Sequence, residues 1–252
     1  MRTYAVSGAG SGIGLAISQY LRKAGSQVIG VDLHEADVIA DLSTKEGRLG
    51  AATAVKKAAG DGLHGIVACA GVSTMVPGRL VIAVNFFGAR DFITSLAPLL
   101  HTEGNVGAVA IASAASSHPA DQRLVRSCLE GSEEQAVAAA GDDGRAAYGA
   151  SKTALVRWVR RAAPTDEWAG AGRSLNAVSP GLVLTPMMAE ANAAEDPRFR
   201  ERYPMPLHGP AVADQIAPLV AHLIGPENSH VSGQNIFIDG ASEAQVRGDV
   251  IW

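Results

Sequence analysis

A tyrosine and a lysine, Tyr148 and Lys152, lie four positions apart in an alanine-rich stretch with helical periodicity. Residues i and i+4 share one face of a helix, so their side chains are expected within reach of each other. An unperturbed tyrosine has a pKa of about 10 and is a weak base at neutral pH. An ammonium about 4.5 Å away, at an effective dielectric of about 20, would stabilise the phenolate by about 3 to 4 kcal/mol. The spacing therefore predicts a phenol that exchanges protons near neutral pH.

A serine, Ser113, follows an apolar run and is the third candidate for chemistry. Its hydroxyl could hydrogen-bond a substrate oxygen on which charge develops. We hypothesise that Tyr148 takes the hydroxyl proton of a secondary alcohol while a hydride leaves, with the roles reversed when a ketone is reduced. The alternative for an isolated Tyr-x3-Lys pair is a surface helix pair, the commoner case in an arbitrary sequence.

A glycine-rich turn directly follows the first predicted strand, and its candidate binding residues are Gly8, Gly10, Ser11, Gly12, Ile13 and Gly14. Glycines let the turn close and let the backbone approach a pyrophosphate, which meets free amides and the positive end of a helix dipole. Such turns also arise for packing alone, so the motif is weak by itself.

An acid at the end of the second strand strengthens the prediction. Asp32 lies 18 positions after Gly14, near the spacing of about 20 expected for a carboxylate that binds the adenosine ribose. Such a carboxylate would repel a 2′-phosphate, and neither Ser7–Ile17 nor Leu33-His34 supplies an arginine or lysine to bind one. The sequence therefore predicts NAD rather than NADP. The alternative for Asp32 is a solvated carboxylate at a strand end.

Short apolar runs alternate with longer helical stretches along the whole chain, which indicates a parallel sheet with right-handed crossovers. Continuous apolar strands such as Val106 to Ala112 suit a sheet buried on both faces. We expect an α/β fold with a single doubly wound parallel sheet of Rossmann type and helices on both faces. The predicted strands are Thr3 to Ser7, Gln27 to Val31, Val38 to Ala40, Gly65 to Ala70, Ala108 to Ser113, Ser174 to Ser179 and Gln234 to Ile238.

No repeat or linker divides the chain, so residues 1–252 are expected to form one domain. Two segments break the alternation. Residues 114–145 form a polar excursion, and residues 186–210 hold five prolines beside Met187, Met188 and Met205. Connections this long are typically lids or binding loops. We expect an insertion and a substrate lid; the methionines could instead fill gaps in the core.

Composition excludes several classes of function. The formal net charge of -4 disfavours nucleic-acid and anionic-membrane partners. Cys69 and Cys128 cannot form a disulfide framework, no two histidines have metal-ligand spacing, and Ser113 lacks the Gly-x-Ser-x-Gly elbow of serine hydrolases. No signal peptide or run of 18 apolar residues occurs, so we expect a reduced cytoplasmic protein without a metal.

These motifs, taken in order, resemble the short-chain dehydrogenase/reductase family along the whole chain. The resemblance rests on Gly8-x3-Gly12-x-Gly14, Cys69-Ala70-Gly71, Asn85, Ser113, Tyr148-x3-Lys152 and Pro180-Gly181-x-Val183-x-Thr185. Within the family the chain most resembles the bacterial 3-alpha-hydroxysteroid dehydrogenase/carbonyl reductase branch, through Val38–Thr44, Val84–Gly88 and a long interval from serine to tyrosine.

The resemblance implies roles for further residues. Ser113, Tyr148 and Lys152 would be catalytic, Lys152 would also hold the nicotinamide ribose, and Asn85 would relay protons through water. Cofactor contacts would come from Ala70, Gly71, Pro180, Gly181, Val183 and Thr185. Asp41 and Leu42, after a third strand-like piece, could hold adenine, or Asp41 could simply cap a helix.

The sequence departs from the family pattern in two places. Ser113 and Tyr148 are 35 positions apart, so the inserted segment should lie beside the substrate mouth and could alter subunit contacts. We expect a homo-oligomer, either dimer or tetramer. Cys69 occupies a position where the family usually has asparagine, which leaves the adenine-side contacts less certain. His118, five residues after Ser113, is a candidate substrate contact or an ordinary loop histidine.

The sequence therefore predicts an NAD-dependent oxidoreductase that interconverts a secondary alcohol and its ketone on a bulky apolar, hydroxysteroid-like small molecule. An aryl ketone or aryl amino alcohol is the alternative substrate class. A non-catalytic NAD-binding sensor is the alternative of another kind, but such proteins tend to lose the tyrosine or lysine kept here. Acyl-carrier reduction is opposed by Asp32 and the negative net charge.

Overall fold

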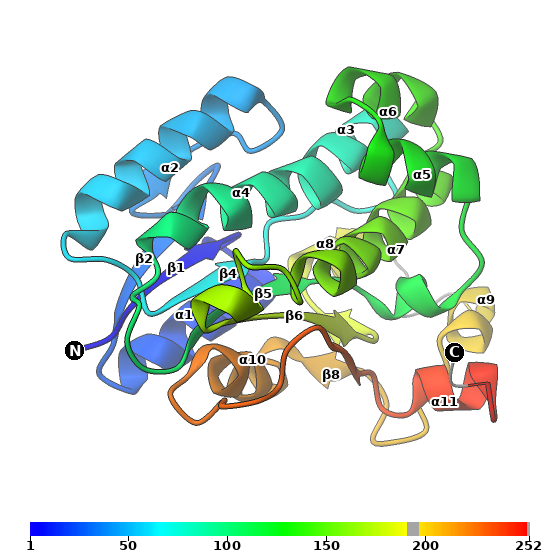
Figure 1. Cartoon of the computed structure of the whole chain (residues 1–252). Helices are drawn as coiled ribbons and strands as arrows, with labels where there is room; N and C mark the ends of the chain where they lie inside the picture. Colours follow the sequence, from blue (N-terminus) through cyan, green and yellow to red (C-terminus); the bar gives the residue numbers. More distant parts are fainter. Residues whose placement is uncertain (191–196, 251–252) are drawn as a thin grey trace.

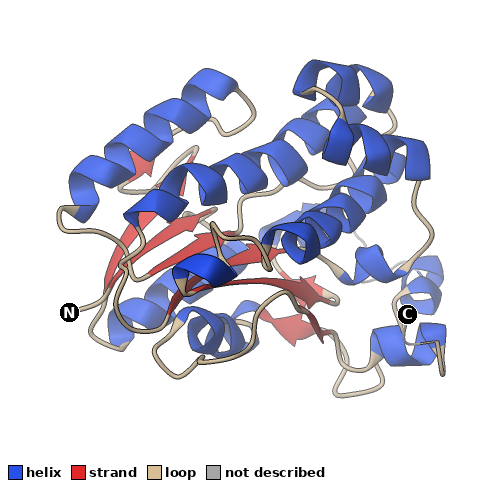
Figure 2. Ribbon diagram, viewed as in Figure 1, coloured by secondary structure: helices blue, strands red, loops and turns tan. Residues whose placement is uncertain are grey.

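A seven-stranded parallel sheet forms the centre of the molecule, with strand order β3-β2-β1-β4-β5-β6-β9. The computed structural model describes residues 1–190 and 197–250. The sheet strands are β1 (Thr3–Ser7), β2 (Gln27–Asp32), β3 (Val38–Ile39), β4 (Gly65–Ala68), β5 (Val106–Ile111), β6 (Arg173–Pro180) and β9 (Asn235–Ile238). The predicted doubly wound fold is confirmed, and Figure 2 shows the sheet between its helices.

Helices cover both faces of the sheet (Figure 1). One face packs on α1 (Gly12–Lys23) and α10 (Ala217–Ile224), and the other on α2 (Lys45–Ala59), α4 (Ala89–Leu96) and α7 (Gly144–Ala162). The central strands β4 and β5 are apolar throughout, because each residue faces one helical layer or the other. Two hydrophobic clusters result, one on each side of the sheet.

The helical stretch between β4 and β5 is composite. It runs from Gly78 to Leu99 as α3 (Gly78–Ile82), the π-helix η1 (Ala83–Gly88), α4 and the 3-10 turn η2 (Ala97–Leu99). This run is long and apolar enough to cross a membrane, but 67% of its most apolar window is buried inside the protein. Its apolar character is therefore explained by packing in the core.

The polar segment at 114–145 is mostly helical. It contains the 3-10 turn η3 (Ala114–Ser117), α5 (Gln122–Glu130) and α6 (Glu133–Ala140). Several polar side chains of this segment are helix caps: Asp121 accepts from backbone amides of α5, Ser132 forms a capping box on α6, and Asp143 caps α7. The two helices pack on α3 and α7.

The segment after β6 leads to the C-terminal part of the chain. It contains β7 (Val183–Leu184), α8 (Pro186–Glu190), α9 (Pro197–Arg202) and β8 (Ala211–Val212), with β7 and β8 paired in parallel. Residues 191–196 of the predicted lid lie outside the described residues. The remaining elements are the 3-10 turns η4 (Ala169–Ala171) and η5 (Ala213–Gln215) and the helix α11 (Ser242–Arg247).

Candidate active site

A cleft runs along the carboxyl ends of β1, β4, β5 and β6, where the strand order reverses between β1 and β4. Open α/β sheets bind ligands at such a switch point. All the predicted site residues line this cleft except Gly10 and Asn85. Pro186, Met187 and Met188 of the predicted lid also line it. The lining further includes residues that the sequence analysis did not propose as contacts: Leu33, Ala40, Cys69, Val72, Val84, Ile111 and Ala112.

The glycine turn closes tightly between β1 and α1. Gly8 has φ +71°, and a Cβ there would lie 2.8 Å from the Ala70 nitrogen. A Cβ on Gly14 would lie 2.1 Å from the Gly8 carbonyl oxygen. Gly12 has φ +52°, and its missing Cβ would sit 3.5 Å from Thr185 Cγ2, across the cleft. The turn thus brings bare backbone to the cleft wall, as a phosphate-binding turn requires.

Asp32 is fixed to this turn by its carboxylate. Oδ2 accepts a hydrogen bond from the Gly10 amide at 2.8 Å, and Oδ1 accepts one from the Leu33 amide at 2.6 Å. A carboxylate oxygen has capacity for a second hydrogen bond, so the group can still accept from hydroxyls in the cleft. Asp32 therefore lies directly beside the glycine turn.

Asp41 and Leu42 form the wall of the cleft beyond β3. Leu42 is 5% exposed, whereas Asp41 is exposed and accepts from the Ser43 amide at 2.8 Å. The alternative that Asp41 caps the following helix is wrong. The cap of α2 is Thr44, whose hydroxyl accepts from the Gly47 amide, because the chain makes one more turn before the helix begins.

Asn85 lies in the π-helix and is fully buried. Its side-chain oxygen accepts from the Val72 amide at 2.8 Å, and its side-chain nitrogen donates to the Val72 carbonyl at 3.0 Å. A Cβ on Gly71 would lie 3.2 Å from Asn85 Oδ1 and 3.9 Å from Lys152 Nζ. A side chain at Gly71 would therefore crowd the oxygen of Asn85 and touch the end of Lys152.

Ser113, Tyr148 and Lys152 meet at the cleft as predicted. Ser113 is hydrogen-bonded to Tyr148 and also accepts from the Ala115 amide at 3.1 Å. Lys152 Nζ lies 5.8 Å from the centre of the Tyr148 ring and donates to the Ile111 carbonyl at 2.9 Å. The lysine is only 6% exposed. The main-chain acceptor on β5 therefore fixes the ammonium beneath the phenol.

The electrostatics of the pair differ from the prediction. Burial raises the pKa of Tyr148 above its usual value, only partly offset by the Ser113 hydrogen bond, and burial lowers the pKa of Lys152 to about 8. The expected lowering of the tyrosine pKa by Lys152 is wrong for the cofactor-free protein. The reason is the order of titration: the lysine loses its proton before the pH at which the phenol ionises, so no positive charge is left to stabilise a phenolate.

The Pro180–Thr185 segment forms the opposite wall. The Gly181 amide donates to the Ile238 carbonyl at 3.1 Å, and a Cβ on Gly181 would lie 2.8 Å from Asp239 Cα. Val183 belongs to β7, and the Thr185 carbonyl accepts from the Met188 amide at 3.0 Å at the start of α8. This segment follows β6, and Thr185 lies opposite Gly12 of the glycine turn.

The inserted segment and the segment after β6 meet through two rings. His118 and Tyr203 are 4.8 Å apart in an edge-to-face arrangement, and Tyr203 lies close enough to Tyr148 to raise its pKa further. Burial lowers the pKa of His118, and Arg202 acts in the same direction. Met187 and Met188 line the cleft, whereas Met205 is half-buried and does not.

Comparisons with known proteins agree with this geometry. A 3-alpha-hydroxysteroid dehydrogenase/carbonyl reductase of Comamonas testosteroni is 38% identical over 258 residues, which cover 98% of this chain and 98% of that protein. The chain belongs to the short-chain dehydrogenase/reductase family. A family model described as enoyl-(acyl carrier protein) reductase matches residues 132–241. The resemblance stated from the motifs is confirmed.

Two further relatives of this dehydrogenase/reductase extend the comparison. A coniferyl-alcohol dehydrogenase of Pseudomonas sp. (strain HR199 / DSM 7063) is 30% identical over 93% of this chain and 94% of that protein. The crystal structure of the 3-alpha-hydroxysteroid dehydrogenase from Pseudomonas sp. B-0831 complexed with NADH is 36% identical. It superposes with a TM-score of 0.89 and covers 99% of this chain and 100% of that chain.

Proposed function

We propose that this dehydrogenase/reductase uses NAD to interconvert a secondary alcohol and its ketone on a bulky, apolar, hydroxysteroid-like substrate. The observation that carries the proposal is the convergence of Ser113, Tyr148 and Lys152 on one cleft with the glycine turn and Asp32. The relatives named for 3-alpha-hydroxysteroids, from Comamonas testosteroni and Pseudomonas sp. B-0831, support the substrate class.

The residues of the cleft fit a dinucleotide. The positive φ angles at Gly8 and Gly12 leave a backbone cradle, and the first turn of α1 directs amides and the positive end of its dipole toward a pyrophosphate. Asp32 would accept from the adenosine ribose hydroxyls. Leu42, Gly71, Pro180, Val183 and Thr185 would complete the walls. When bound, NAD supplies the acceptor or donor of a hydride.

NAD is favoured over NADP by the charge at Asp32. Both carboxylate oxygens are already held by the backbone amides of Gly10 and Leu33, so the negative charge cannot swing away from an added 2′-phosphate. The NADH in the Pseudomonas sp. B-0831 structure supports the same choice.

Proton transfer belongs to Tyr148 in this mechanism. Its hydroxyl takes the proton of the substrate alcohol during oxidation and returns one to the carbonyl oxygen during reduction. Ser113, already hydrogen-bonded to the phenol, donates to the same substrate oxygen and stabilises the charge that develops there. Because the phenol is protonated at neutral pH, the residues are set for ketone reduction at that pH.

Lys152 and Asn85 complete the proton path. Lys152 would hold the nicotinamide ribose through its ammonium, which is protonated below a pKa of about 8. The side chain of Asn85 accepts one hydrogen bond from Val72 and donates one to it, and its oxygen and nitrogen each retain capacity for a water molecule on a path toward Lys152. The same two bonds fix the segment that follows Gly71.

A second substrate class is an aryl alcohol or ketone. The coniferyl-alcohol dehydrogenase that matches 93% of the chain favours it, and the apolar side chains of Met187 and Met188 with the His118–Tyr203 ring pair would accept a flat ring system. Methionine adapts its shape readily, so the same wall suits either class.

The proposal is tested by a cofactor and substrate panel. Reduction of NAD and of NADP is followed with hydroxysteroids and with aryl alcohols, with Tyr148→Phe as the inactive control. NAD-dependent oxidation of hydroxysteroids is expected. Activity with NADP alone would overturn the argument from Asp32, and activity with aryl alcohols alone would replace the first substrate class by the second. If the protein binds NAD but turns over no substrate of the panel, it would be a non-catalytic NAD-binding sensor.

A further inference from the structure

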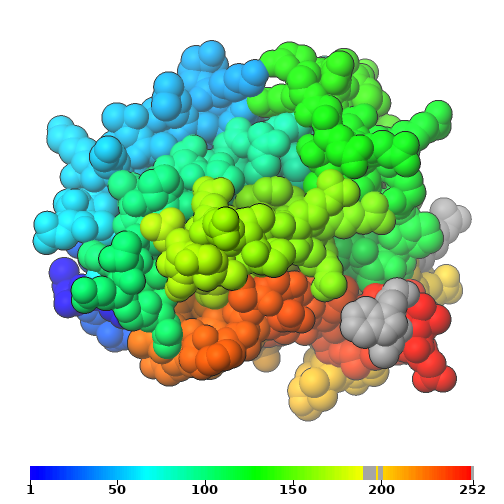
Figure 3. All heavy atoms as spheres, viewed as in Figure 1, coloured from blue at the N-terminus to red at the C-terminus, as the bar shows by residue number. Residues whose placement is uncertain are grey.

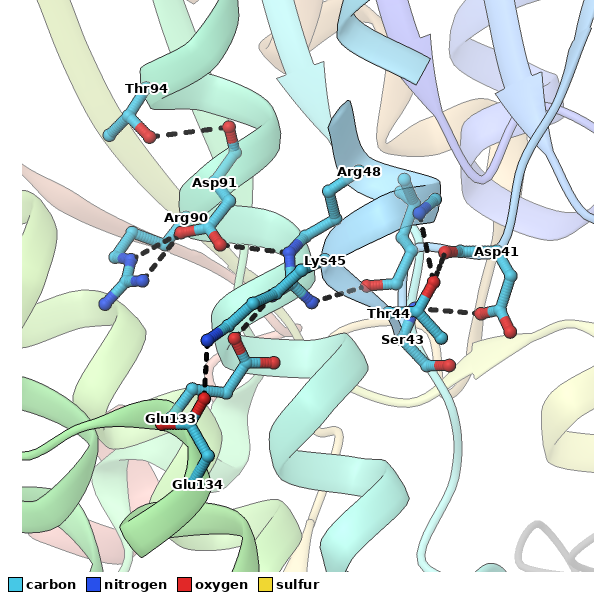
Figure 4. A network of polar contacts seen from close by, with 12 residues as sticks. Asp41, Ser43, Thr44, Lys45, Arg48, Arg90, Asp91, Thr94, Glu133 and Glu134 are labelled. Atoms are coloured by element: carbon cyan, nitrogen blue, oxygen red, sulfur yellow. Dashed lines mark hydrogen bonds and ion pairs between the residues drawn. The ribbon is translucent and has the colours of Figure 1, made fainter. Parts of the chain in front are cut away.

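An arginine that the sequence analysis did not select, Arg48, is buried where three parts of the chain meet. It lies in the first turn of α2, and its side chain is 4% exposed. Its Nε contacts Asp91 Oδ2 of α4 at 2.9 Å, and its Nη2 contacts Glu133 Oε2 of α6 at 2.5 Å. Figure 4 shows Arg48 between these two carboxylates.

The remaining nitrogen of Arg48 binds the main chain of a residue that lines the cleft. Nη1 donates to the main-chain carbonyl of Leu42 at 3.1 Å, in a buried hydrogen bond. Leu42 lines the cleft together with Ala40 and Asp41. The same carbonyl packs on the π-helix, because a Cβ on Gly88 would lie 3.1 Å from it. The position of the Leu42 main chain is therefore set by Arg48 from one side and by the π-helix from another.

The charges around Arg48 are balanced within the group. Arg90 pairs with Asp91 at 2.7 Å, so Arg48 and Arg90 share Asp91 while Glu133 serves Arg48. Removing the charge of Glu133 would leave two arginines with one carboxylate in a poorly solvated place. We expect the Arg48 guanidinium then to turn toward water or toward Asp91. Its hydrogen bond to the uncharged Leu42 carbonyl is the weakest of its contacts, so that bond would be lost first.

A second ion pair joins the same two helices and differs in burial. Lys45 of α2 contacts Glu134 of α6, and their side chains are 61% and 68% exposed. Figure 3 shows the green atoms of the inserted segment meeting the blue atoms of α2 at the surface. Glu133 and Glu134 are adjacent in the first turn of α6. Glu133 forms a buried ion pair with α2 and Glu134 forms an exposed one, so the two residues can be compared directly.

We propose that Arg48 is a positioning residue for the cofactor and that Glu133 makes the insertion part of the cofactor-binding machinery. Arg48 holds the Leu42 carbonyl and thereby the adenosine-side wall of the cleft, and Glu133 holds Arg48. The inference rests on the proposed function, since it assigns the adenosine half of NAD to this wall. The insertion then acts at the adenosine end of the cleft through α6 as well as at the substrate mouth through His118.

A merely structural role would predict a different pattern. Removing one partner of a buried ion pair leaves an uncompensated charge and is destabilising, so a merely structural role for Arg48 would show mainly in the unfolding transition. A positioning role would show in the affinity for the adenosine half of the cofactor. It would leave the rate at saturating cofactor almost unchanged, because Leu42 follows β3 at the edge of the sheet whereas Ser113 follows β5, four strands further along it.

The experiment compares Glu133→Gln with Glu134→Gln in the full chain. The Kd for NADH is measured by fluorescence titration, and the inhibition constant of AMP probes the adenosine half alone. The melting temperature of each variant is also measured. For Glu133→Gln we expect both constants to rise about tenfold, the weight of one charge-assisted hydrogen bond, with kcat at saturating NAD within about twofold of the parent. For Glu134→Gln we expect both constants within about twofold.

Arg48→Lys and Arg48→Met provide a second measurement should Glu133→Gln fold poorly. The lysine keeps the charge but reaches fewer of the three acceptors, so we expect NADH affinity between that of the parent and that of Arg48→Met. Unchanged NADH and AMP constants in folded Glu133→Gln would overturn the inference, and so would equal losses in Glu134→Gln. Failure of the parent protein to bind NADH would instead defeat the proposed function, so the two failures are distinguishable.

Discussion

Lys152 is an ionisable side chain held almost entirely out of water. Its pKa falls to about 8 through burial, while the unfolded chain titrates at 10.5. The unfolded chain therefore binds more protons between these two values, and this residue makes the free energy of unfolding rise as the pH increases from 8 to 10.5. At pH 7 the buried charge is at its most destabilising.

Replacing Lys152 by methionine should therefore stabilise the protein while abolishing its activity. The lowered pKa corresponds to about 3 kcal/mol at pH 7, and loss of the bond to the Ile111 carbonyl offsets about 1 kcal/mol of it. We expect Lys152→Met to raise the free energy of unfolding by about 2 kcal/mol at pH 7 and by much less at pH 10. Urea denaturation at the two pH values measures this, and a destabilised Lys152→Met protein at pH 7 would contradict it.

Tyr148→Phe should separate binding from proton transfer. The change removes one hydroxyl and keeps the ring, so the cleft retains its shape. We expect turnover to fall by about 10³-fold, within the range of general acid–base catalysis, with the Kd for NADH within about threefold. The raised pKa of Tyr148 further implies that ketone reduction by the parent enzyme stays constant through neutral pH and declines only in alkali. Near-native turnover in Tyr148→Phe would show that another group moves the proton.

The sequence located the reacting residues but not their environment. The i, i+4 spacing of Tyr148 and Lys152, and their place after the glycine turn and Ser113, were sufficient to group them. Their pKa values depend on burial by parts of the chain that are distant in sequence. Lys152 contacts Ile111 of β5, 41 positions away, and Tyr148 is influenced by Tyr203, 55 positions away. Arg48 gave no signal, because an arginine in the first turn of a polar helix is usually solvated.

At the scale of elements, the helices of the insertion are the main addition to the predicted pattern. The periodicity of the strands and long helices predicted the sheet, because each of those elements buries a face. The insertion was interpreted as a polar excursion that includes Asp121 and Asp143. Each of them starts a helix instead. A short helix with an N-cap can be missed when its apolar face is made of alanine, as in α6.

The capping box of α6 should be measurable as stability of the insertion. Ser132 accepts from the Gln135 amide, and its own amide donates to the Gln135 side chain. We expect Ser132→Ala to lower the free energy of unfolding by about 1 kcal/mol and to speed amide exchange in the first turn of α6. Ser132→Asn, which can still cap, is the control. Equal exchange rates in the parent and Ser132→Ala would argue that packing alone fixes the helix.

At the scale of the whole molecule, the two edges of the sheet are unequal. Among the described strands, β3 at one edge has two residues, whereas β9 at the other has four, which include the half-buried Ile236, Phe237 and Ile238. Natural proteins cover such an edge or blunt it with charge. We expect a second copy of the chain to pack at this edge.

The predicted homo-oligomer can be checked by light scattering. We expect a mass of two or four times the 25.9 kDa of the chain, with the apolar β9 edge covered in the assembly. Phe237→Lys should shift the mass toward that of one chain at low protein concentration. A parent protein that elutes with the mass of one chain at all concentrations would contradict the prediction.

The order of strands also decides how the chain is exposed while a ribosome makes it. β1 to β5 are neighbours in space and complete by Ile111, but β6, the partner of β5 on its free side, begins at Arg173, after 61 intervening residues. At about 5 to 20 residues per second this interval lasts about 3 to 12 seconds. Throughout it, the nascent polypeptide presents the bare backbone of an entirely apolar strand, which makes this the interval in which a chaperone would matter most.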